Sequence, residues 1–254
     1  MEVAVQGGAR PTPFLQARDL FETEFDLDLP VRVYVRSDPD ERTWASHPGG
    51  HHVLNISNAA ARSAMACELA LHEFAHMYRY EQEHVSHRHP TEEAIYLTLA
   101  GRRTATETIT HCYQIANHVK DIYADDLTLR FVSGRKLVTF LESQLARAVA
   151  ENGIGDHVSG GVRHPTIDPE LAAVNAAFAA GLVDRHDLIG SSHDLYTFAD
   201  ILAYDAPTIP FQRLRGLFGD LPEDPTVSQF RRSLTDAIQT YVDATEPGGE
   251  PKSS

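Results

Sequence analysis

The stretch from Ala60 to Tyr80 constrains the fold more than any other part of the chain. Its apolar side chains recur at helical spacing along two neighbouring lines: Ala66, Ala70, Phe74 and Met77 on one, and Cys67, Leu71, Ala75 and Tyr78 on the other. A helix that is apolar over most of its circumference is buried on most sides. The pattern therefore predicts a long central helix against which other elements pack.

Two strands are predicted before this helix and only helices after it. Residues 31–37 alternate apolar and polar side chains, and residues 51–57 (HHVLNIS) form a second strand pattern. One helix is expected before them, at 13–25, and later helices at 91–101, 104–129, 136–151, 170–183, 194–206 and 227–242. This order predicts an α+β fold that is mostly helical, with a small antiparallel or mixed N-terminal sheet packed on the central helix.

A glycine- and histidine-rich segment, residues 156–169, follows the helix stop at Asn152-Gly153 and divides the chain. We expect a core in residues 1–152 and a helical C-terminal lobe, residues 153–245, packed on that core. The last residues, 246–254, are polar and rich in glycine and proline, so we expect a disordered tail.

The charge balance excludes two classes of partner. The chain has 36 acidic and 22 basic residues and a net charge of −14. Nucleic acids and anionic membranes both require a basic face, so neither is expected as a partner. Only three of the basic residues are lysines. This acidic, arginine-using composition favours a halophilic protein, because negative surface charge maintains solubility where salt screens repulsion.

Cysteine usage and the absence of targeting segments favour the cytoplasm. The two cysteines, Cys67 and Cys112, lie in apolar helical patterns, which indicates buried thiols in a reducing compartment. The N-terminal residues lack the basic start and apolar run of a secretory signal. No apolar stretch reaches the roughly 18 residues of a membrane span.

The central helix carries the sequence HEFAH, in which His72 and His76 flank Glu73 and two apolar residues. Side chains four apart share one helix face, so the two imidazoles can bind one metal ion. Glu73 is rotated by about 100° from His72, which keeps it off the metal but near a metal-bound water. With 14 histidines the pattern can arise by chance, but two buried histidines need polar partners.

These residues resemble the zincin metallopeptidases, which place an HExxH motif on a helix beside an edge strand that pairs with the substrate. The resemblance covers roughly residues 31–129. It implies that His72 and His76 hold one zinc ion per chain, and that Glu73 is the general base that activates a metal-bound water. It also implies that residues 51–57 are the edge strand, and that the substrates are peptides or proteins.

The third ligand distinguishes the zincin subclasses. Metzincins continue with glycine and histidine where this chain has Arg79 and Gln82, which excludes that subclass. Gluzincins supply a glutamate from a later helix and an aspartate four residues on, and aspzincins use an aspartate as ligand. The segment NHVKDIYADD has Asp121 and Asp125 at that spacing. The resemblance makes Asp121 the third ligand and Asp125 the partner of a ligating histidine, with Asp125 or His118 as the alternative ligand.

The sequence therefore predicts a cytoplasmic, zinc-dependent hydrolase, a metallopeptidase with Glu73 as general base. The alternative is a metal-stabilised or metal-free helical binding domain without turnover. A further histidine group, His84, His87 and His89, lies in residues 81–90, which are polar and end at a proline. We expect that segment to be a surface loop outside the metal site.

Overall fold

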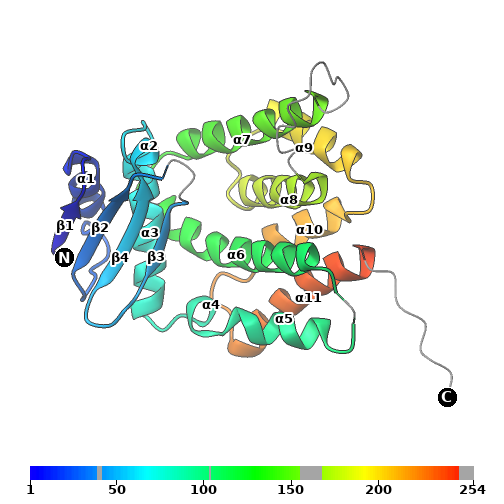
Figure 1. The fold of residues 1–254 in the computed structure, drawn as a ribbon, viewed down its shortest axis with the longest axis horizontal. Helices are drawn as coiled ribbons and strands as arrows, with labels where there is room; N and C mark the ends of the chain where they lie inside the picture. The colour runs from blue at the N-terminus through cyan, green and yellow to red at the C-terminus, as the bar shows by residue number, and fades with distance from the viewer. Residues whose placement is uncertain (39–41, 103, 155–167, 246–254) are drawn as a thin grey trace. The chain divides into compact units, whose positions relative to one another are not determined.

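The computed structural model describes residues 1–38, 42–102, 104–154 and 168–245 (Figure 1). The fold is α+β and mostly helical, as predicted, with a mixed sheet near the N-terminus. The expected tail, 246–254, and most of the expected loop after Asn152 lie outside the described residues. Within the described residues, no helix combines the length and apolar character that crossing a membrane requires.

The sheet has four strands in the order β1-β2-β4-β3. Their bounds are β1 (Val3–Gln6), β2 (Val31–Arg36), β3 (Trp44–Ser46) and β4 (His52–Ser57). β1 and β4 both run parallel to β2, whereas β3 runs antiparallel to β4. Gly49 and Gly50, with φ of 88° and 68°, provide the left-handed turn that reverses the chain between β3 and β4.

The strand order corrects one expectation from the sequence. Residues 51–57 were expected to form the edge strand, but β4 lies between β2 and β3 and is paired on both sides. Leu54, for example, is opposite Val33 on one side and Ala45 on the other. The edges of the sheet are β1 and β3. β3 has only three residues, too few to show alternation in the sequence.

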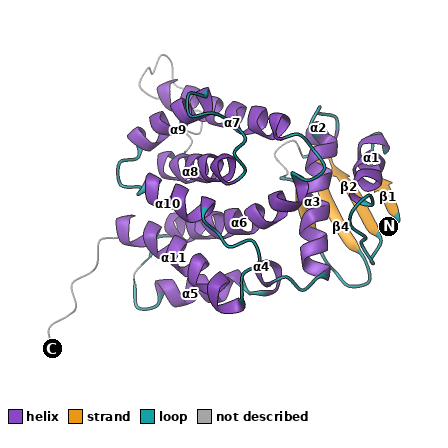
Figure 2. Ribbon diagram, turned by 180° about the vertical axis from the view of Figure 1, so that it is seen from behind, coloured by secondary structure: helices purple, strands orange, loops and turns teal. Residues whose placement is uncertain are grey.

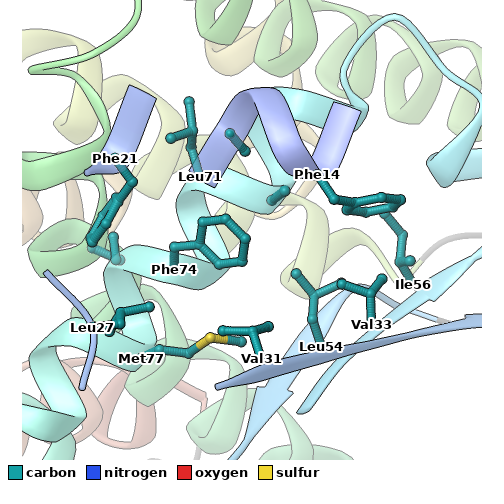
Figure 3. Packing of buried hydrophobic residues seen from close by; sticks show 14 of the residues in the cluster. Phe14, Phe21, Leu27, Val31, Val33, Leu54, Ile56, Leu71, Phe74 and Met77 are labelled. Carbon is teal, nitrogen blue, oxygen red and sulfur yellow. The ribbon is translucent and has the colours of Figure 1, made fainter. Parts of the chain in front are cut away.

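The sheet, α1 (Thr12–Phe21) and α3 (Ala66–Glu81) enclose a hydrophobic core (Figure 3). Phe14 and Phe21 of α1 and Phe74 of α3 are fully buried, and the Phe21 and Phe74 rings meet edge to face, 6.1 Å apart. The strands contribute Val31, Val33, Leu54 and Ile56. Each such side chain stabilises the fold by about 1.5–3 kcal/mol on burial, so this core fixes how α3 lies on the sheet.

The predicted helix at 60–80 is interrupted. α2 (Asn58–Ala61) ends before Arg62, and α3 begins at Ala66. Ser63 explains the break, because its hydroxyl donates to the carbonyl of Ala60 and accepts the N–H of Met65, replacing helical backbone bonds. The HEFAH motif nevertheless lies in the middle of α3, as expected.

The chain divides into two compact units, each made of two stretches. The first, residues 1–89 and 120–133, holds the sheet, α1 to α4 (Val85–Arg88) and the C-terminal part of α6 (Thr106–Thr128). The second holds the rest of the chain. Every element described in it is a helix (Figure 2). The division at residue 152 that the sequence suggests stays a prediction.

The helices wholly within the second unit are α5 (Thr91–Leu99), α7 (Gly134–Ile154), α8 (Pro169–Arg185), α9 (Asp194–Asp205), α10 (Phe211–Gly219) and α11 (Val227–Thr245). α10 was not expected from the sequence. It packs on the alanine-rich helix α8, where Gly181 permits the contact. A Cβ atom at Gly181 would lie 2.7 Å from the carbonyl oxygen of Arg215.

Candidate metal centre

The motif residues and the acidic pair meet within the first unit. His72, Glu73 and His76 lie in α3, and Asp121 and Asp125 lie in the C-terminal part of α6. The two segments are about 50 residues apart in the chain, and the structure brings them together.

Hydrophobic packing sets which faces of α3 and α6 oppose each other. Leu71 precedes the motif, Phe74 lies within it, and both are fully buried. Ala124 and Leu127, on either side of Asp125, belong to the same hydrophobic core. Rotating either helix about its axis would expose such side chains, at a cost of about 1.5–3 kcal/mol each. The polar residues between them are therefore held in position by the core.

Three side chains converge on one point. The Nε2 atoms of His72 and His76 are 3.0 Å apart. Asp121 Oδ1 lies 3.3 Å from His76 Nε2 and 3.8 Å from His72 Nε2. A tetrahedral zinc ion with bonds of about 2.0–2.1 Å holds its ligand atoms roughly 3.3 Å apart. The three separations bracket that value, so these side chains fit a zinc ion.

Asp125 fixes the orientation of His72. Its Oδ1 accepts a hydrogen bond from His72 Nδ1–H at 2.7 Å, which turns Nε2 toward His76 and Asp121. Burial alone would lower the pKa of His72, but the charges of Asp125, Asp121 and Glu73 outweigh it and raise this pKa to about 10. The site thus attracts positive charge, and a metal cation at Nε2 would replace a proton.

His87 holds the second histidine, a contact that the sequence did not reveal. His76 Nδ1 lies 2.7 Å from His87 Nε2, and His87 Nδ1 lies 2.8 Å from the Ser86 hydroxyl. Burial, followed by the charges of His76 and Lys120, lowers the pKa of His87 well below its usual value. The neutral His87 ring accepts from His76 Nδ1–H, which leaves His76 Nε2 bare for a metal.

The expectation of a surface loop at 81–90 is therefore wrong in part. Glu83, with φ of 54°, ends the α3 segment in a left-handed turn, and the next residues form the short helix α4. This fold-back carries His87 to His76. A glycine at the left-handed position would have signalled the turn in the sequence, but this chain has glutamate there.

Glu73 is buried, with 5% of its surface exposed. Burial raises its pKa, and the charges of His76 and His72 oppose that effect. Its place on α3, one residue after His72, gives it a different direction from the two histidines. It has the burial and the neighbourhood of a proton acceptor beside the three candidate ligands.

His118 has partners of its own. His118 belongs to the second unit, where its Nε2 lies 2.8 Å from Asn175 Oδ1. Its ring stacks on Phe178, with centroids 4.0 Å apart and planes 8° apart. Asp125 faces the far nitrogen of His72 rather than Nε2. Of the three ligands considered from the sequence, the geometry favours Asp121.

A family model described as "Family of unknown function (DUF5781)" matches residues 1–243. No curated protein and no solved structure matches the chain.

Proposed function

The chain belongs to the DUF5781 family, and we propose that it is a zinc-dependent hydrolase that cleaves peptide bonds. One observation carries the proposal. Two histidine nitrogens and an aspartate oxygen lie 3.0–3.8 Å apart on a buried scaffold, and the glutamate of the same motif stands beside them. This combination would supply three protein ligands to a zinc ion, the number found in catalytic rather than structural zinc sites.

Each side chain has a distinct task in this proposal. His72, His76 and Asp121 hold the ion, while Asp125 and His87 engage the Nδ1 atoms of the two imidazoles and so direct their Nε2 atoms toward it. Zinc, when bound, supplies a Lewis acid that polarises a carbonyl group and makes water acidic near neutral pH.

Glu73 accepts the proton of the attacking water at its carboxylate and later delivers it to the leaving amine. Burial raises the pKa of this carboxyl, which makes Glu73 a stronger proton acceptor than an exposed glutamate.

The resemblance to zincins assigns the substrate to an edge strand, and the structure offers β3 for this role. Among the described residues, β3 is paired only with β4, and it contacts α3. An extended peptide can add to its free edge through main-chain hydrogen bonds, which favours peptides or unfolded protein segments as substrates. We further propose a cytoplasmic location, because the chain has only two cysteines and both lie in apolar helical patterns.

Substitution of Glu73 tests the proposed chemistry. The zinc-loaded parent should hydrolyse members of a pool of internally quenched peptides, assayed near neutral pH in both low and high salt. Glu73→Gln should hold the same zinc per chain and lose about 10²- to 10⁴-fold in turnover. Glu92→Gln, at an exposed position of α5, is the matched control and should retain activity. Hydrolysis that survives Glu73→Gln would refute the role of Glu73.

The same experiment separates the enzyme from a non-catalytic domain that zinc merely stabilises. The candidate ligands join α3 to α6, so a bound ion would also stabilise this part of the fold. In a purely structural role, neither parent nor variant would hydrolyse any peptide. His72→Ala would still lower the melting temperature through loss of metal.

A further inference from the structure

A second polar chain, formed by Glu81, His52 and His47, lies in the same unit and takes no part in holding the metal. Glu81 Oε1 lies 2.8 Å from His52 Nε2, and the Nδ1 atoms of His52 and His47 are 2.7 Å apart. His52 is fully buried, and both of its ring nitrogens are engaged inside the protein. His47 is partly exposed and follows directly after the edge strand β3.

Glu81, at one end of this polar chain, fixes the direction of its hydrogen bonds. Its two oxygens accept the backbone N–H groups of Asp28 and Leu29, at 2.8 and 2.9 Å, so this carboxylate acts as an acceptor. It also receives the proton of His52 Nε2, which leaves His52 Nδ1 bare. His47 Nδ1–H donates to that nitrogen. The neutral ring of His47 therefore keeps a bare Nε2, which can only accept.

The protonation states agree with this assignment. Burial, helped by His52 and His76 and opposed by Glu81, lowers the pKa of His47 to about 4. Burial also lowers the pKa of His52, against the influence of Glu81. Both rings are thus neutral near pH 7, the state that the chain of hydrogen bonds requires.

Tyr80 links His47 to the helix face that carries the two candidate histidine ligands. His72, His76 and Tyr80 follow one another at intervals of four residues and share one face of α3. The His47 ring stacks on the Tyr80 ring, with centroids 3.8 Å apart and planes 14° apart. His47 therefore follows the edge strand and stacks on the residue that lies one helical turn beyond His76.

Building on the proposed function, we propose that His47 binds the substrate, with Nε2 accepting a hydrogen bond from a main-chain N–H of a peptide aligned along β3. Two features point to an N–H group. A bare imidazole nitrogen cannot donate to the oxyanion of a reacting carbonyl, which excludes that role. β3 has only three residues, so a longer extended peptide has N–H groups beyond Ser46 for which the strand provides no carbonyl.

Peptide affinity in an inactive background tests this assignment without relying on turnover. The zinc-loaded Glu73→Gln protein is titrated with a fluorescent decapeptide from the pool and with analogues in which one amide N–H at a time is replaced by an ester oxygen. One ester position should weaken binding about fivefold, the worth of a single neutral hydrogen bond. Adding His47→Ala should weaken binding of the all-amide peptide by a similar factor and abolish the effect of that ester.

Two further variants guard against a merely structural effect. His47→Gln keeps an acceptor oxygen near the position of Nε2 and should restore most of the affinity and the ester effect. His51→Ala is the matched control, because His51 is partly exposed and its Nδ1 lies 3.2 Å from the carbonyl oxygen of Gly49, outside the hydrogen-bonded chain from Glu81 to His47. It should behave as the parent. In addition, nitrogen-15 NMR should show His47 with a protonated Nδ1 and a bare Nε2.

The outcomes distinguish this inference from the proposed function. Peptides that bind with the His47-dependent ester effect but are never cleaved by the unmodified protein would refute hydrolysis and leave the role of His47 standing. If the protein cleaves peptides but His47→Ala abolishes no ester effect, the role of His47 alone is overturned. A protonated Nε2 on His47 would overturn that role as well. Peptides that are neither bound nor cleaved would overturn both.

Discussion

Zinc and protons should compete for Nε2 of His72, and Asp125 controls that competition. The pKa of His72 in the metal-free protein is about 10, so this ring is protonated from pH 7 to pH 9. Zinc binding must then release one proton, because the ligand has to be bare. Below this pKa, each rise of one pH unit increases the deprotonated fraction of His72 about tenfold. The apparent zinc association constant should therefore increase about a hundredfold between pH 7 and pH 9.

Asp125→Asn changes both the strength and the pH dependence of zinc binding. The amide keeps the shape but removes the charge that raises the pKa of His72, so the pH dependence should become shallower. The weaker hold on His72 should lower zinc affinity at pH 9 by about 10- to 100-fold. Acidification weakens zinc binding strongly only in the parent. The difference in zinc affinity between the two proteins should therefore narrow toward pH 7.

The assay is a zinc titration against a chromophoric chelator of known affinity, at constant ionic strength from pH 7 to pH 9. Circular dichroism checks that the metal-free proteins remain folded over this range. Asp126→Asn, one residue further along α6, is the control and should follow the parent. Parallel curves for the parent and Asp125→Asn, or a parent curve without pH dependence, would contradict this account of the site.

Three further expectations follow from single contacts. His87→Ala removes the acceptor for His76 Nδ1–H and should weaken zinc binding by about tenfold in the same titration, with an unchanged circular dichroism spectrum. Gly181→Ala forces a Cβ against Arg215 and should cost about 1–3 kcal/mol of unfolding free energy in denaturant, whereas Gly216→Ala, in open space on α10, should be neutral or slightly stabilising. A chelator should lower the melting temperature of the zinc-loaded protein but leave that of a His76→Ala variant unchanged.

The sequence predicted those parts of the structure in which the pattern of apolar residues repeats over a long stretch. α3 and the later part of α6 have many buried residues at helical spacing, so their existence and their polar faces could be inferred. The four-residue spacing of Asp121 and Asp125 likewise placed both on one face, and the structure brings that face to His72. In each case local periodicity carries enough information to orient side chains.

Helical spacing could not choose among the candidate ligands. His118 shares the face of Asp121 but lies three residues earlier, about 4.5 Å back along the axis. That offset is enough to place its ring against Phe178 and Asn175 of α8 instead. Spacing defines a direction around a helix, whereas the neighbour met in that direction depends on long-range packing.

The contacts missed from the sequence depend on short or irregular elements. β3 is three residues long, and a sequence pattern that omits it leaves β4 at the edge of the sheet. The turn at Glu83, which returns His87 to His76, uses a residue that rarely adopts positive φ. In the series of hydrogen bonds from Glu81 to His47, the bond between Glu81 and His52 joins residues that are 29 positions apart in the sequence. No local pattern encodes such a pairing.

The central claim is that one zinc ion is bound by His72, His76 and Asp121. X-ray absorption spectroscopy at the zinc edge of the loaded protein tests it most directly. The account predicts one zinc per chain with two imidazole nitrogens at about 2.0–2.1 Å and oxygen as the remaining ligands at about 2.0–2.2 Å. It also predicts that one imidazole is lost on His76→Ala. A sulfur ligand, a shell without histidine, or a spectrum unchanged by that substitution would contradict it.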